Sequence, residues 1–99
     1  MLTANELASR VEAYHPTADL ETVRRAHGFA SAAHDGQYRK SGDPYFSHPL
    51  NVACIITELR LDGASVCAAL LHDVVEDTEV TSEDLEREFG TEIAFLVDG

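Results

Sequence analysis

Long hydrophobic segments are missing from this sequence of 99 residues. No apolar run approaches the roughly 20 residues that a transmembrane helix needs, so the sequence predicts no membrane span. The segment from Met1 to Glu6 contains no basic stretch followed by an apolar one, so we expect no signal peptide. These absences, with the composition of an ordinary globular domain, predict a soluble protein of the cytoplasm.

Cysteine is also scarce, with two residues in the chain. Cys54 and Cys67 each lie within an apolar helical pattern. We therefore interpret them as buried free thiols in a reducing compartment rather than as a disulfide or a metal-binding pair.

Basic residues are few: 7 Lys and Arg face 18 Asp and Glu, giving a net charge of -11. Nucleic-acid binding depends on basic patches that contact phosphates, so this composition argues against a nucleic-acid-binding surface. The overall field would also repel a phosphate ester. A substrate of that kind would need a bound cation and a few local basic groups.

What the sequence does contain is helical periodicity, which predicts an all-α fold of five to six helices, with no convincing strand. Start and stop signals are a capping box at Thr3, proline after His15, a cap at Thr81 and a glycine at position 90. The expected helices are Thr3 to Tyr14, Asp19 to His34, His48 to about Leu59, Asp62 or Gly63 through at least Val74, Thr81 to Phe89, and Thr91 to Gly99.

Two further expectations concern packing. In the third helix, the core stripe should consist of Val52, Ile55, Ile56 and Leu59. The apolar stretch from 93 to 97 has little chain after it to cover it, so we expect residues 1–99 to be the N-terminal part of a single domain that is incomplete at its C-terminus. Covering by a second copy or another chain is the alternative. Within the sequence, 1–18 would form an N-terminal helix and 19–99 would carry the site.

The most informative stretch is His72-Asp73-Val74-Val75-Glu76-Asp77. His72 and Asp73 would lie about 100° apart on one helix, and Glu76 and Asp77 would follow one turn later. Four ionisable groups in an apolar helix are costly unless they are paired or bind a cation. A solvated polar face with an acidic helix end is the alternative.

His48 is the natural third ligand, because it begins a helix after a loop and can point into a cleft. A simple cap or a buried, hydrogen-bonded histidine is the alternative. Two imidazoles and one carboxylate suit Mn, Fe, Zn or Co better than Ca or Mg. We interpret His15 and His27 as structural or surface groups and His34 as a brace for the following loop.

That loop, residues 35–47, is long for a helix connection, and such loops are often functional. Arg39 and Lys40 are the only adjacent basic pair besides Arg24 and Arg25, and they could meet phosphates or stack on a base. Solvated loop charges are the alternative. Arg24 and Arg25 lie within a helix and are better read as a solvent-facing pair.

Taken together, these stretches resemble the hydrolase domain at the N-terminus of Rel/SpoT-type proteins, a branch of the HD-domain metal-dependent phosphohydrolases. The matching segments are 34–45, 48–53, 68–78, Phe89-Gly90 and Leu96 to Gly99. The helix before Leu20 is similar to that of the long bifunctional members.

The resemblance implies a helical HD domain that removes the 3′-pyrophosphate of (p)ppGpp, usually with Mn2+, to give GDP or GTP. By the same resemblance, the site residues divide into metal ligands His48, His72 and Asp73, an acidic pair Glu76 and Asp77 that handles the attacking water, and substrate-binding residues Arg39, Lys40, Ser41 and Tyr45.

The family's fourth protein ligand is an aspartate that would lie beyond Gly99, and the synthetase domain of the long members has no counterpart here. We therefore expect weak or no activity from this chain alone. Two alternatives stay open: an HD phosphohydrolase for another nucleotide such as NADPH, and an inactive module that associates with itself.

Overall fold

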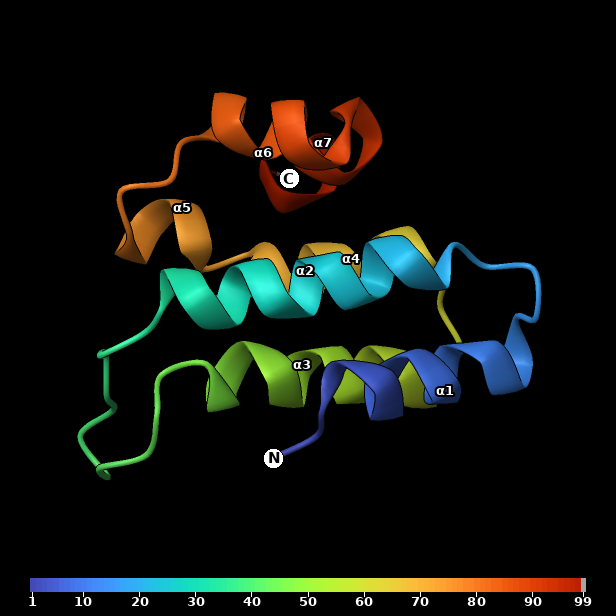
Figure 1. Cartoon of the computed structure of the whole chain (residues 1–99), viewed down its shortest axis with the longest axis horizontal. Coiled ribbons are helices and arrows are strands. Elements are labelled where there is room, and N and C mark those ends of the chain that lie inside the picture. The colour runs from blue at the N-terminus through green and yellow to red at the C-terminus, as the bar shows by residue number, and fades with distance from the viewer. Residues whose placement is uncertain (99) are drawn as a thin grey trace.

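The computed structural model describes residues 1–98, and its helices lie in three tiers (Figure 1). The lower tier in this view holds α1 and α3, the middle tier α2 and α4, and the upper tier α6 and α7. The bounds are α1 Ala4–Tyr14, α2 Leu20–Ala33, α3 Ser47–Glu58, α4 Gly63–Leu71, α5 Val74–Asp77, α6 Ser82–Phe89 and α7 Thr91–Asp98. Apart from helices, residues 1–98 contain one isolated β-bridge, between Tyr38 and Pro44, so the all-α prediction is confirmed.

The predicted helix ends are present, and local hydrogen bonds stabilise several of them. Thr3 and Thr81 each make a capping box, with Glu6 and Asp84 as the respective partners three residues later. The first helix ends at Tyr14, because the residue before Pro16 avoids the helical region. Gly90 ends α6 with φ 91°, a conformation that favours glycine.

Asp62 caps the N-terminus of α4 through a 2.9 Å hydrogen bond from the Ser65 amide to Oδ1. We expect Asp62→Ala to lower the free energy of unfolding by about 1 kcal/mol at pH 7. Hydrogen bonds from Ser65 hold the pKa of this carboxyl below its usual value. The stabilisation is therefore complete above the unfolded-state pKa of roughly 4 and is lost as the pH falls through the lowered folded-state pKa.

Urea unfolding of the parent and Asp62→Ala at pH 7 and near pH 2 measures this loss, and Asp62→Asn is the matched control because asparagine caps about as well without titrating. A difference between parent and Asp62→Ala that is equal at both pH values would contradict the assignment.

The hydrophobic core is centred on α4, whose residues 66–71 are all buried. This helix packs against α2, α3 and α7, and α2 buries a stripe of small residues, Val23, Ala26 and Ala30. Small side chains allow the two helices to approach closely. Cys67 is buried and Cys54 is partly buried, and both are free thiols as predicted.

The predicted core stripe of α3 is wrong at two positions. Ile55 is 54% exposed and Leu59 is 63% exposed. The helix instead buries Leu50, Ala53 and Thr57 and only partly buries Val52 and Ile56. The helix is turned so that Ala53, a small residue, lies in the core, which puts the bulkier Ile55 and Leu59 outside.

The predicted fourth helix is divided into two helices at His72 and Asp73. His72 caps the end of α4, and Asp73 precedes the single turn of α5. The imidazole Nδ1 of His72 lies 2.5 Å from the carbonyl oxygen of Ala69. That carbonyl would accept the amide of Asp73 in a continuous helix, so the side chain competes with the helix for its acceptor.

The last helix, α7, buries Ile93 and Ala94 and exposes Phe95 and Leu96. The expected helix to Gly99 is seen as far as Asp98, and Gly99 lies outside the described residues. Within 1–98, no helix combines the length and the apolar character needed to cross a bilayer.

Candidate metal centre and adjoining loop

Three segments meet at one end of the molecule, where the loop between α2 and α3 approaches the junction of α4 and α5 (Figure 1). The first turn of α3 contributes His48, and the α4–α5 junction contributes His72 and Asp73. The loop contributes Tyr45, whose hydroxyl reaches Asp73 and Asp77. Most of the predicted site residues are therefore neighbours in space.

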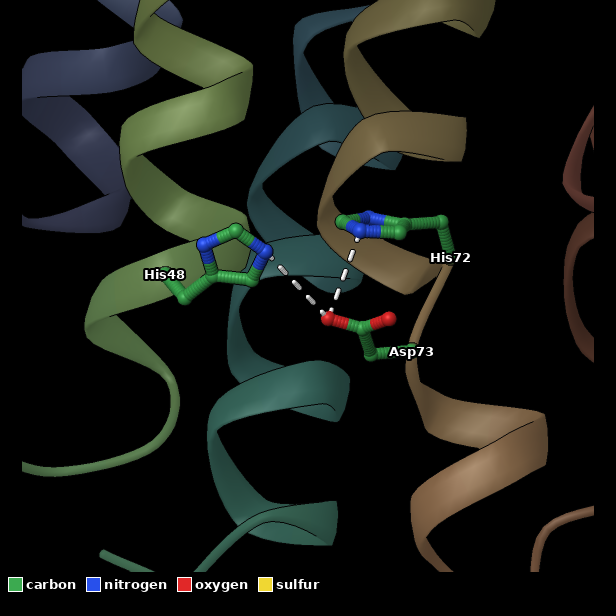
Figure 2. A group of neighbouring side chains, drawn as sticks. All are labelled: His48, His72 and Asp73. Carbon is green, nitrogen blue, oxygen red and sulfur yellow. Dashed lines mark ion pairs between the residues drawn. The ribbon is translucent and has the colours of Figure 1, made fainter. Parts of the chain in front are cut away.

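Both imidazoles point toward one carboxylate oxygen (Figure 2). Nε2 of His72 lies 3.3 Å and Nε2 of His48 lies 3.8 Å from Oδ2 of Asp73. Ligand atoms of the three residues all lie within 4.8 Å of one another, and this is the one such group among residues 1–98. Ligands that sit about 2.1 Å from a shared metal are separated by roughly 3.0 to 3.4 Å in octahedral or tetrahedral sites, so a divalent metal fits with small movements.

The tautomer of His72 also suits a metal ligand. Its Nδ1 faces the Ala69 carbonyl, which can only accept, so the proton is on Nδ1 and Nε2 carries a free lone pair. A carbonyl partner on the second nitrogen is how metal-binding histidines are commonly oriented. The same contact that ends α4 thus prepares His72 for coordination.

Tyr45 connects the cluster to the acidic pair. Its hydroxyl donates to Oδ2 of Asp77 at 2.8 Å and lies 3.4 Å from Oδ2 of Asp73. The hydrogen bond to Asp77, with burial and the nearby carboxylate charges, raises the pKa of Tyr45 to about 12. At neutral pH the phenol is therefore protonated and acts as a donor to these carboxylates.

The loop forms a small hairpin around the bridge of Tyr38 and Pro44. The amide of Arg39 donates to the carbonyl of Asp43, and the amide of Gly42 closes the tip by donating to Arg39, each at 2.8 Å. Gly42 adopts φ 92° there. Arg39, Lys40 and Ser41 are exposed and line an open hollow that also reaches Tyr38 and Tyr45.

Glu76 lies apart from the three metal-site side chains. It is exposed and lines a separate hollow with Gln37 and Asp77. Asp77 thus takes part in both the hollow and the Tyr45 contact. Asp77, rather than Glu76, accepts the hydrogen bond from Tyr45, whose hydroxyl also lies near Asp73.

Gln37 was missed as a site residue by sequence reasoning. Its side chain donates to the Asp77 carbonyl at 2.8 Å and lies 2.9 Å from the His34 ring. The one available signal was its place within a loop already judged functional. His34 does brace this loop as predicted, because it is buried and contacts both Gln37 and Tyr45.

The domain is all-helical, with a His-Asp pair at a helix break and a second histidine close to the pair. These features are typical of a class of metal-binding helical domains. A family model described as HD domain matches residues 26–99. The chain belongs to the HD domain family, as the resemblance implied.

The chain is also similar to much longer curated proteins. It is 52% identical over 89 residues to a GTP pyrophosphokinase of Myxococcus xanthus, covering 90% of this chain and 12% of the relative. It is 46% identical over 99 residues to the GTP pyrophosphokinase rsh of Brucella ovis, and 44% identical over 99 residues to the bifunctional (p)ppGpp synthase/hydrolase SpoT of Escherichia coli K12. These matches cover all of this chain and 13% and 14% of the two relatives. The chain therefore aligns with a Rel/SpoT-type HD region and spans a small part of those proteins.

Proposed function

We propose that this chain carries the His48, His72 and Asp73 part of a metal-dependent site that hydrolyses (p)ppGpp to GDP or GTP and pyrophosphate, with Mn2+ as the metal. The observation that carries the proposal is the convergence of both imidazoles on Asp73 Oδ2, beside a hydrogen-bonded Asp77. The name of the Escherichia coli relative, a bifunctional (p)ppGpp synthase/hydrolase, supports the choice of substrate.

A divalent metal held there would supply a Lewis acid for a phosphate oxygen and lower the pKa of a bound water. The residues of the chain would position the water. Asp77 is the better candidate to orient or deprotonate a water near the cluster, because Tyr45 holds its carboxylate toward Asp73. Glu76, on the same turn, lines the neighbouring hollow with Gln37 and Asp77.

The loop would provide the charge that the acidic chain otherwise lacks. Arg39 and Lys40 are exposed at the hairpin tip and share a hollow with Tyr45, which links them to the cluster. We propose that Arg39, Lys40 and Ser41 bind the nucleotide. Arginine suits both phosphate contact and stacking on a base.

The test measures pyrophosphate release from ppGpp with and without Mn2+. It uses the 99-residue chain and a form extended by the segment that follows the matching residues in the Escherichia coli relative. We expect Mn2+-dependent release by the extended form and little by the chain alone. An extended form that binds Mn2+ and releases no pyrophosphate would contradict the proposal.

The same assay separates the alternatives. NADPH is run beside ppGpp, and faster turnover of NADPH would favour an HD phosphohydrolase of another specificity. Light scattering is run on the chain alone. A stable oligomer without turnover in either form would favour the non-enzymatic alternative.

A further inference from the structure

A single glutamine ties together three parts of this site. Gln37 is half-buried in the loop after α2. Its Nε2 donates to the carbonyl of Asp77 at 2.8 Å, and its Oε1 lies 2.9 Å from Nδ1 of His34. Its backbone carbonyl accepts the amide of Tyr45 at 2.9 Å, and its backbone amide donates to the carbonyl of His34 at 3.0 Å. Each polar atom of Gln37 therefore has a partner.

The chemistry of these partners fixes the protons. The Asp77 carbonyl can only accept, so the amide NH2 of Gln37 must face it and Oε1 must face His34. Nδ1 of His34 then donates, and the ring is held as the Nδ1-protonated tautomer. His34 is 2% exposed, and its Nε2 has no partner among residues 1–98. A ring buried in this way is fixed by packing and by Gln37.

Asp77 is consequently held at two points. Gln37 holds its backbone carbonyl, and the Tyr45 hydroxyl holds its carboxylate at 2.8 Å. Tyr45 itself depends on the same network, because its amide bonds to Gln37 and its ring lies 4.9 Å from the His34 ring. Both loop contacts to Asp77 therefore involve Gln37: its side chain holds the Asp77 carbonyl, and its backbone carbonyl holds the amide of Tyr45. The amide of Asp77 itself donates to the carbonyl of Asp73 at 3.0 Å.

We propose that Gln37, supported by His34, is a positioning residue that fixes the Asp77 carboxylate and Tyr45 relative to the metal cluster. Its catalytic consequence rests on the proposed function, whereas the contacts themselves can be tested without turnover. A displacement of about 1 Å in a reacting group can cost roughly 100-fold in rate. We expect a loss of about tenfold or more in kcat when Gln37 is replaced.

The contacts are tested first, by NMR of the 99-residue chain. Gln37→Met keeps the side-chain length and removes both side-chain hydrogen bonds. Asp35→Asn is the control, because Asp35 is exposed in the same loop. We expect the parent and the control to show His34 as the Nδ1-protonated tautomer, and Gln37→Met to show mixed tautomers with a shifted Asp77 carbonyl resonance. Unchanged His34 and Asp77 signals in a folded Gln37→Met chain would overturn the proposal.

The positioning role is tested next by a double-mutant cycle with Asp77→Asn, in the form that turns over nucleotide. Gln37→Met should lower kcat about tenfold or more and leave KM and Mn2+ affinity within about twofold. In the Asp77→Asn background the same change should cost less than about twofold, because residues acting as one unit are not additive.

Additive losses, or a loss confined to KM, would overturn the proposal, since a merely structural role predicts the first and a substrate contact the second. If the parent turns over no nucleotide, the proposed function fails and the NMR comparison alone decides whether Gln37 fixes Asp77.

Discussion

Replacing Asp73 by alanine is expected to abolish divalent metal binding, with an apparent Kd for Mn2+ raised at least about 100-fold. Asp73 is the one anionic member of the cluster, and its Oδ2 is the atom on which His48 and His72 converge at 3.8 and 3.3 Å. Without it, two neutral imidazoles are left to hold a cation. Tyr45 keeps its stronger hydrogen bond, to Asp77, so the neighbouring loop should keep its conformation.

Calorimetry or Mn2+ electron paramagnetic resonance measures this loss, and a thermal melt shows that the variant is folded. Asp35→Ala is the matched control, since it removes the same carboxylate from an exposed position outside the cluster. The control should bind Mn2+ like the parent. A folded Asp73→Ala chain that binds Mn2+ as tightly as the parent, or a parent that binds none, would contradict a metal centre built on these three residues.

Features set by neighbours in sequence could be predicted without the structure. The caps at Thr3 and Thr81 are hydrogen bonds across three residues, and the end of α1 follows from the proline at position 16. The small-residue stripe of α2 follows from its spacing alone. Part of the candidate metal cluster could also be predicted from the sequence, because two of its members, His72 and Asp73, are adjacent in the chain.

The helix break at His72 was not predictable from periodicity. A helical pattern reports which faces are apolar, and it continues across positions 72–74 without a proline or a glycine. At the break, Nδ1 of His72 contacts the Ala69 carbonyl, the acceptor that a continuous helix would offer to the Asp73 amide.

Gln37 illustrates a second limit. Its partner Asp77 is 40 residues away in the sequence, and nothing in either residue type signals the pairing. Only the packing of α2 against α4 brings the ends of these helices together. The assignment of Tyr45 as a substrate contact came from resemblance and stays a prediction, while its hydroxyl lies against two carboxylates.

The face that α3 buries was the clearest error, because that helix carries two competing apolar stripes. Helix α3 packs most closely with α4, and a sequence cannot say which stripe will face a neighbour whose position is not yet known. The stripe with Leu50 and Ala53 was buried, and the stripe with Ile55 and Leu59 was left exposed. Leu50, in the first turn of α3, and Leu59, the C-terminal cap residue, turn the distinction into a measurement.

Leu50→Ala is expected to lower the free energy of unfolding by about 2 to 5 kcal/mol, because Leu50 is 2% exposed and its truncation leaves a cavity as well as removing apolar contact. For a domain of this size, that is a large part of a total stability of about 5 to 15 kcal/mol. A loss of about 2 kcal/mol alone would lower Tm by at least roughly 8 °C. Leu59→Ala makes the identical chemical change at a side chain that is 63% exposed. Its loss of unfolding free energy should stay within about 0.5 kcal/mol.

Urea unfolding of the parent and both variants at pH 7, with the slope of the transition compared as well as its midpoint, gives the two free energies. An outright unfolded Leu50→Ala chain agrees with the expectation, provided that Leu59→Ala folds normally. Equal losses in the two variants, or a larger loss at Leu59, would mean that α3 buries the other stripe. Because His48 lies on the same helix, its orientation toward Asp73 would then have to be different as well, so this stability measurement also tests the geometry of the metal centre.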